Sequence, residues 1–91
     1  MMNKYVVEFL GTLFLMFVIL ATGNYLAIGA ALAVGVFLGG AISGGSFNPA
    51  VTLSLVAAGK LKLMEVAPYI FAEVAGGLTA VQLYKMFYIK K

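Results

Sequence analysis

The sequence predicts an all-α membrane protein with three transmembrane helices and one re-entrant half-helix. Hydrophobic residues make up 64% of the chain and charged residues 10%, whereas soluble domains contain roughly 45–50% and 25%. The hydrophobic residues form long uncharged runs of the length that crosses a bilayer. Between two of these runs stands one polar, turn-forming segment, residues 43–52. The runs predict the transmembrane helices, and the polar segment predicts the half-helix.

The first two hydrophobic runs each have the length of one span. Residues 5–21 are apolar except for Glu8 and Thr12, and residues 26–42 carry no charge. The turn that joins them is too short to hold a domain, so the two spans are expected to be antiparallel. A cleaved signal peptide is the alternative for the first run. Lys4 would suit it, but Glu8 interrupts the apolar region and further spans follow.

The re-entrant element is expected at residues 43–58. Asn48 suits the cap before a helix, Pro49 suits the first helical position, and Gly59 favours its end. Ten residues at about 1.5 Å each give a rod of roughly 15 Å, which is half of the ~30 Å hydrocarbon core. The alternative is an ordinary Asn-Pro turn outside the membrane, which predicts more polar flanks than residues 51–58 provide.

The third span is expected at residues 63–84, with Pro68 in its early turns, where a missing N–H costs least. The aromatic and basic segment that follows it is typical of a membrane interface. Small residues recur at helical spacing on the second and third spans: Gly35, Gly39, Ala72, Gly76 and Ala80. Because small residues let helix backbones approach closely in lipid, we interpret this spacing as helix packing.

The composition argues against an enzyme. The chain contains no Cys, His or Asp and only three Glu, so the usual nucleophile–base pairs and metal clusters cannot be assembled. The lysines lie near the ends of the apolar runs and form no single basic face. We therefore expect no catalytic residue, no cofactor, no metal and no nucleic-acid partner.

The polar segment requires partners for its backbone, because irregular backbone at membrane depth is tolerated only when it is buried in protein or lines water. Glu8 is the candidate to accept its N–H groups as a structural brace, and contact with a permeant is the alternative. We expect the Asn48 oxygen to cap the half-helix, so that its NH2 group points beyond the positive helix end. Such an end repels cations and orients water by its oxygen.

Three motifs together resemble the aquaporin and glycerol-facilitator family. Residues 43–52 read SGGSFNPAVT, which looks like the signature of that family's first repeat. Residues 8–12, EFLGT, and residues 72–77, AEVAGG, resemble motifs of its first and third helices. The resemblance implies a bundle of two inverted repeats, each with three spans and a half-helix, and residues 1–91 would supply one of them. It also implies half-helices that meet at mid-pore and, usually, four pores in a tetramer.

The chain departs from that family in three ways. Only one of the two repeats is present. Glu73 stands where the family commonly has Gln, and we predict a second brace there, with a gate or proton site as the alternative. The family's filter uses an Arg after the second Asn-Pro-Ala, whereas Val51 follows the motif here and Ile28 falls at the second-span filter position. The predicted pore residues are Ile28, Gly44, Gly45, Phe47, Asn48, Pro49, Ala50 and Val51.

The lysines indicate no preferred orientation in the membrane. Three are expected on each side, namely Lys4, Lys60 and Lys62 against Lys85, Lys90 and Lys91. Because orientation follows Lys and Arg counts, the chain is expected to insert both ways. Two opposed copies would recreate the missing inverted repeat about a two-fold axis in the membrane plane.

The predicted function is passive transport across the membrane by a multi-pass channel for water or small neutral solutes such as glycerol. An antiparallel dimer, with two Asn48 residues at the pore centre, would complete this channel. The alternative is a non-conducting protein, either an N-terminal fragment or an accessory subunit of a longer channel.

Overall fold

The computed structural model describes residues 3–89, which form helices and no strand. The elements in chain order are α1 (Lys4–Thr22), α2 (Tyr25–Ser43), α3 (Pro49–Ala57), the 3₁₀ turn η1 (Leu63–Glu65) and α4 (Val66–Tyr88). Three helical segments are long and apolar enough to cross a membrane, namely Lys4–Thr22, Tyr25–Ser43 and Leu63–Tyr88. The predicted fold class is confirmed: the chain is all-α, with three candidate spans and one half-length helix.

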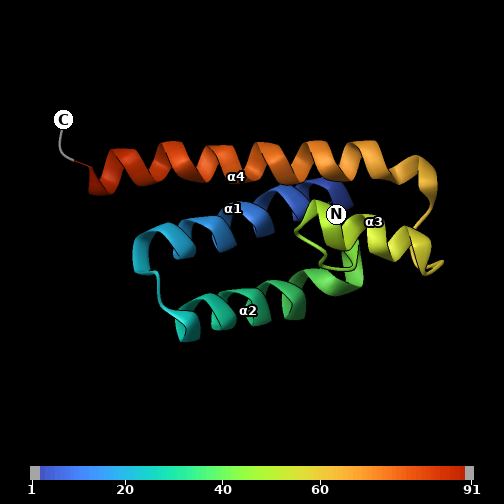
Figure 1. Ribbon diagram of the computed structural model, residues 1–91, viewed down its shortest axis with the longest axis horizontal. Helices are drawn as coiled ribbons and strands as arrows, with labels where there is room; N and C mark the ends of the chain where they lie inside the picture. Colours follow the sequence, from blue (N-terminus) through green and yellow to red (C-terminus); the bar gives the residue numbers. More distant parts are fainter. Residues whose placement is uncertain (1–2, 90–91) are drawn as a thin grey trace.

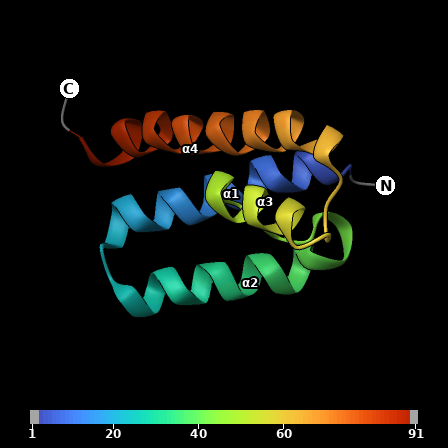
Figure 2. The same cartoon turned by 45° about the vertical axis from the view of Figure 1, so that its right-hand side comes forward.

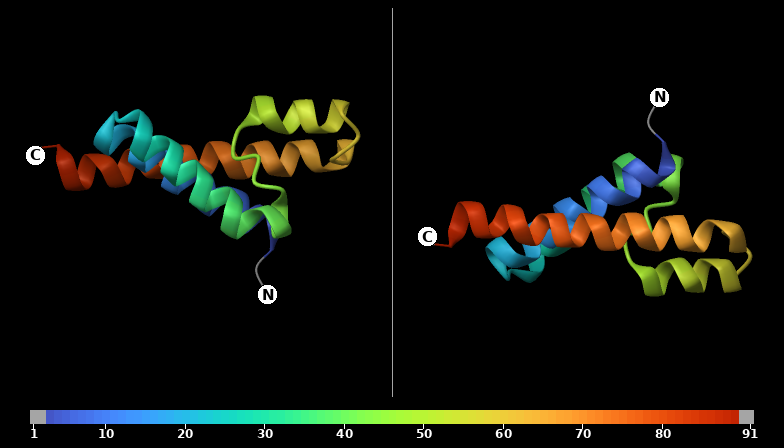
Figure 3. Two further views of the ribbon diagram at one scale, coloured as in Figure 1. Left: turned by 90° about the horizontal axis from the view of Figure 1, so that it is seen from below. Right: turned by 90° about the horizontal axis from the view of Figure 1, so that it is seen from above.

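The helix α1 lies in the middle of the bundle. It packs against α4 on one side and against α2 on the other (Figure 1). The short helix α3 packs on the first half of α4, and the turned view shows it in front of α1 (Figure 2). Seen from above and below, α1 and α2 cross α4 obliquely, while α3 runs alongside it (Figure 3). The beginning of α1 and the end of α4 lie at opposite ends of the bundle.

Asparagine caps set the starts of the three α-helices that precede η1. The side-chain oxygen of Asn3 accepts a hydrogen bond from the Tyr5 N–H, and Asn24 accepts from the N–H groups of Leu26 and Ala27. Gly23, in the left-handed conformation with φ 56°, ends α1. The turn between α1 and α2 is therefore only two residues long, as an antiparallel pair requires.

The observed helices extend slightly beyond the expected spans. α1 and α2 each gain one residue at both ends relative to 5–21 and 26–42. α4 continues to Tyr88, beyond the expected end at residue 84, because the next four residues include no Gly or Pro that would stop it. α3 ends at Ala57 with Ala58 as its cap. At nine residues it is roughly 14 Å long, about half of a hydrocarbon core.

Small residues on α4 allow the close contact with α1. A Cβ atom placed on Gly76 would lie 2.4 Å from the Phe9 carbonyl oxygen, so α1 and α4 approach almost backbone to backbone. Ala72 and Ala80 are buried in the same stripe. Outside this contact, large apolar side chains are exposed, as on the lipid-facing or partner-facing surface of a membrane protein, and Phe37 on α2 is 84% exposed.

Candidate functional site

The candidate site is the loop between α2 and α3, residues 44–48, together with the first turn of α3. The loop turns sharply because Gly44 and Gly45 adopt positive φ angles of 89° and 65°. Phe47 also has a positive φ, 53°, which is uncommon for a residue with a side chain and costs on the order of 1–3 kcal/mol. Such a backbone persists only where its surroundings hold it.

Glu8 of α1 is the main partner of this loop. Its side chain is 0% exposed and accepts four hydrogen bonds. Oε2 accepts from the Ser43 hydroxyl at 2.7 Å and the Ser46 N–H at 3.2 Å. Oε1 accepts from the Ser46 hydroxyl at 3.0 Å and the Phe47 N–H at 2.8 Å. The structure thus brings Glu8 and the loop together, in an arrangement that supports the interpretation of Glu8 as a brace.

Glu73 of α4 connects the loop to α3. It is 1% exposed, and its Oε2 lies 2.7 Å from the Thr52 hydroxyl oxygen and 2.8 Å from that of Ser46. These two hydroxyl oxygens are themselves 2.7 Å apart. One compact polar cluster therefore joins α1, the loop, α3 and α4 inside the bundle.

A further contact, absent from the sequence predictions, is made by Tyr69. Its hydroxyl donates to the Ser43 carbonyl at 2.7 Å, and the side chain is 1% exposed. Tyr69 stands one helical turn before Glu73, so both face the loop from α4. That spacing is a signal from which the sequence could have suggested Tyr69. The hydroxyls of Ser46 and Thr52 lie within the signature motif but were not expected to connect the two carboxyl groups.

Asn48 has the geometry of a helix cap. Its side-chain oxygen accepts from the Ala50 N–H at 2.7 Å and the Val51 N–H at 3.4 Å. Asn48 and Ala50 are exposed, Val51 is 42% exposed, and Pro49 is partly buried. The N-terminal end of α3, with its partial positive charge, is therefore open at one face of the bundle.

The other predicted pore residues lie in different surroundings. Gly44 is exposed and Gly45 is buried. The Phe47 side chain is only 4% exposed, and a Cβ atom on Gly11 or Gly35 would come within 2.1 Å or 3.0 Å of its ring. The ring therefore fills space between α1 and α2, and only the Phe47 backbone is left to line a passage.

The predicted filter residues, Ile28 and Val51, lie in the first turns of two different helices, and these two helices start far apart. Ile28 is partly buried in the first turn of α2. α3, with Val51 in its first turn, comes after the opposite end of α2 (Figure 1). Within one chain, the structure does not bring these two side chains to a common constriction.

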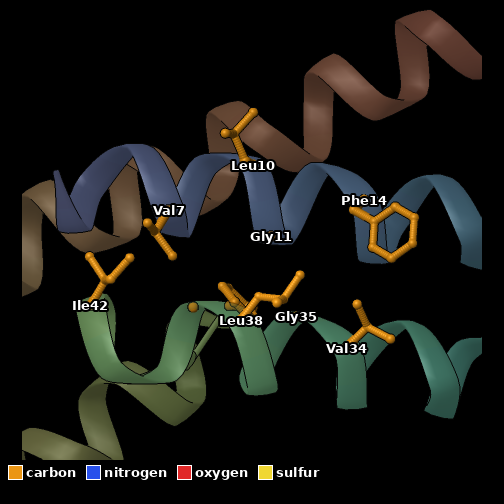
Figure 4. Close-up of a pocket in the computed structure, with 10 residues that line it drawn as sticks. Val7, Leu10, Gly11, Phe14, Val34, Gly35, Leu38 and Ile42 are labelled. Carbon is orange, nitrogen blue, oxygen red and sulfur yellow. The ribbon is translucent and has the colours of Figure 1, made fainter. Parts of the chain in front are cut away.

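A groove of about 410 Å³ lies between α1 and α2. Val7 faces Ile42 at one end of it, and Phe14 lies near Val34 at the other (Figure 4). Its lining side chains are all hydrocarbon, and Asn48 is not among them. Because none of these side chains can hydrogen-bond water or a hydroxyl, the groove is a poorer candidate for a solute path than the open end of α3.

The lysines that the structure describes lie toward the ends of the bundle. Lys4 forms an ion pair with Glu65 of η1, which brings the start of α1 beside the segment that contains Lys60 and Lys62. Lys85 lies in the last turn of α4, toward the other end. Lys90 and Lys91 lie outside the described residues. Among residues 3–89 no group of three or more His, Cys, Asp or Glu could hold a metal ion.

This fold and site define a class: an integral membrane protein in which three apolar helices hold a loop and a half-length helix opened by Asn-Pro-Ala. Residues 23–91 match the family model described as Major intrinsic protein. The chain belongs to this family. The match confirms the resemblance seen in its motifs and the prediction that it is an integral membrane protein.

Relatives of known name agree with this assignment. The chain is 39% identical, over 95 aligned residues, to glycerol uptake facilitator protein-like 6 of Lactiplantibacillus plantarum, covering 94% of this chain and 44% of that protein. It is also 39% identical to aquaporin Z of Photorhabdus laumondii, covering 88% and 41%. A third relative, aquaporin-10 of Milnesium tardigradum, is 43% identical over 75% of this chain and 18% of its own length. The chain spans about two fifths of the length of the first two relatives.

Proposed function

We propose that this chain forms a passive channel for water and small neutral solutes, and that two antiparallel copies complete the pore. The observation that carries the proposal is the open N-terminal end of α3, capped by the exposed Asn48 and held by buried contacts to Glu8 and Glu73. One such end is half of a symmetric pore. The names of the relatives, an uptake facilitator for glycerol and aquaporins, support the class of solute.

The chemistry of this end favours neutral solutes. The Asn48 oxygen is engaged by the helix N–H groups, which leaves its NH2 group to donate to an oxygen atom of a passing molecule. The half-helix adds roughly half a positive charge at the same place. In the dimer, two such ends meet at mid-pore, so cations are disfavoured while water and hydroxyl groups find donors.

The positions of Ile28 and Val51 support an antiparallel pair. In a single chain Ile28 lies in the first turn of α2, whereas Val51 lies in α3, which follows the other end of α2. A two-fold axis in the membrane plane reverses one copy, which brings Ile28 of one copy to the level of Val51 of the second. The pore then has two equivalent filters, each made by both copies. The lysines favour this arrangement, because their balance between the two ends permits both orientations.

The filter composition points to small polyols as well as water. Val51 is much smaller than an Arg and carries no charge, so a filter of Ile28 and Val51 is wider and more apolar than one with a guanidinium group. Ile28 narrows the path, but we expect the greater width to prevail because an Arg side chain fills far more space than the Val51 side chain. A solute with a carbon backbone and hydroxyl groups suits such a filter.

The competing proposal is a non-conducting protein that needs a separate second half. It is favoured by the coverage of the relatives, 44% and 41% of their lengths. Osmotic measurements on vesicles that contain only the purified chain distinguish the two. The dimer predicts fast shrinkage in a glycerol gradient followed by fast re-swelling. Rates equal to those of protein-free vesicles would refute the homodimeric channel and support the second-half proposal.

A further inference from the structure

The Glu8 carboxylate is surrounded by hydrogen-bond donors. A carboxylate offers about four acceptor positions, and four donors occupy them: two backbone N–H groups and the hydroxyls of Ser43 and Ser46. The two backbone N–H groups cannot turn away, so Glu8 acts as an acceptor at both of its oxygens.

The atoms around Glu73 contain too few hydrogens for a second carboxylate. Four short oxygen–oxygen contacts join the Glu8 carboxylate, the Ser46 and Thr52 hydroxyls and Glu73 Oε2, at 2.7–3.0 Å. The two hydroxyls supply one hydrogen each. If Glu73 were ionised, two of the four contacts would press lone pairs together without a hydrogen between them. A proton on Glu73 Oε2 removes one of these two repulsions.

With that proton, the cluster forms one directional chain. Glu73 Oε2–H donates to Thr52, the Thr52 hydroxyl donates to Ser46, and the Ser46 hydroxyl donates to the Glu8 carboxylate. The contact left over, between Ser46 and Glu73, shares the Glu73 hydrogen as a bifurcated bond. Each step of the chain is 2.7–3.0 Å long, which is the normal range for hydroxyl donors.

The second oxygen of Glu73 supports the neutral form independently. Oε1 is buried and has no hydrogen-bond partner among the residues that the structure describes. In a carboxylate this atom would carry half of a buried charge without a partner, whereas in a carboxylic acid it is a neutral carbonyl oxygen.

The charged and titratable groups packed against Glu73 leave no cation to balance it. α1 contributes Glu8, and it also carries Tyr5, whose ring packs against Tyr69, and Lys4, which is engaged by Glu65 of η1. From α4 comes Tyr69, whose hydroxyl donates to the Ser43 carbonyl. α3 contains no titratable residue, and that of α2 is Tyr25, at its far end. Two buried, ionised carboxylates would thus lie on either side of two hydroxyl groups, and no cation would balance their negative charges.

We infer that Glu73 carries a proton, and that this proton latches the loop of residues 44–48 to α3 and α4. Losing the proton breaks the hydrogen-bond chain at its first donor and adds a second negative charge to the cluster. Deprotonation of Glu73 therefore releases the latch. This inference concerns the protonation of Glu73 and holds whether or not the chain conducts.

Carboxyl NMR tests the proton directly, because the chain has three acidic residues and no Asp. In protein made with glutamate labelled by ¹³C at the side-chain carboxyl, we expect two carboxylate signals and one neutral-acid signal at about pH 7. The neutral signal should disappear in Glu73→Gln and remain in Glu65→Gln. Three carboxylate signals in the wild type, or a neutral signal that survives Glu73→Gln, would overturn the assignment. The wild-type spectrum decides the first point even if a variant fails to fold.

Amide hydrogen exchange tests the latch. Over the pH range in which the neutral-acid signal disappears, the Ser46 and Phe47 amides should become less protected against exchange. Their protection should fall at least tenfold below that of the same amides in Glu73→Gln at the same pH. The side-chain amide of that variant cannot ionise, so the comparison removes the intrinsic effect of pH on exchange. Equal protection of these amides in both proteins, after the neutral-acid signal of the wild type has disappeared, would overturn the latch. A neutral-acid signal that persists to about pH 10, beyond the range of most buried carboxyl groups, would overturn it as well.

Discussion

Replacing the Glu8 carboxylate by an amide measures how strongly one side chain holds the site. Glu8→Gln keeps the size of the side chain but turns one oxygen into an NH2 group. Each oxygen of Glu8 accepts from one backbone N–H and one hydroxyl. Whichever oxygen is lost, the hydroxyl can turn and accept from the new NH2 group, but the buried backbone N–H cannot turn away and loses its acceptor.

The magnitude follows from the hydrogen bond that this N–H loses. A hydrogen bond to a charged group contributes about 1.5–3 kcal/mol, so we expect a loss of that size. The typical net stability of a folded protein is only about 5–15 kcal/mol. For a chain of this size, such a loss lowers the midpoint of thermal unfolding by at least about 6 °C.

Thermal unfolding of the purified protein in detergent, followed by circular dichroism, is the assay. The matched control is Glu73→Gln, which makes the same change at a site that is equally buried. There the new NH2 group can donate to the Thr52 and Ser46 oxygens, so we expect a loss below about 1 kcal/mol. If Glu73→Gln destabilises the protein as much as Glu8→Gln does, the assigned charges of the two residues are wrong.

Three further predictions concern packing, selectivity and topology. Gly76→Ala should lower the thermal midpoint, because its Cβ atom would lie 2.4 Å from the Phe9 carbonyl oxygen. Gly77→Ala is the control and should leave the midpoint unchanged, because its Cβ atom would lie 4.0 Å from its nearest neighbour. Equal midpoints in the two variants would contradict the close contact of α1 with α4. Val51→Arg should slow glycerol re-swelling of vesicles more than water efflux, and an unchanged ratio of the two rates would exclude Val51 from the filter. Two Lys residues added beside Lys60 should bias insertion to one orientation and reduce flux. The orientation is measured by labelling a single introduced Cys with an impermeant thiol reagent. Labelling of one terminus only in the starting protein would refute insertion in both orientations.

The sequence predicted the elements of the fold well because each depends on local chemistry. Uncharged runs of membrane-spanning length mark the spans, and the Asn-Pro pair marks the start of α3 regardless of what packs on it. Glu8 was identifiable as a brace candidate because it is the one charge within the first run and the loop needs acceptors.

The polar cluster was less accessible because it depends on tertiary packing. Which hydroxyl connects Glu8 to Glu73 is decided by the way α3 packs on α4, and neither Ser46 nor Thr52 signals this by its spacing. The position of the Phe47 ring is likewise set by the glycines of two other helices, Gly11 and Gly35. The separation of Ile28 from Val51 follows from the path of the whole chain and not from either motif.

The central claim is that the Asn48 cap lies in the conduction path, and a second asparagine cap in the chain offers a direct test. Asn24 makes the same two hydrogen bonds at the start of α2, in a turn expected at the membrane surface. Asp caps helices as well as Asn does, so Asn48→Asp and Asn24→Asp should both fold. In vesicles that contain only the purified chain, we expect no cation flux with the wild type and with Asn24→Asp. Asn48→Asp, which puts two negative charges at mid-pore, should conduct cations. Equal cation flux in the two variants, or none in either, would contradict a pore centred on Asn48.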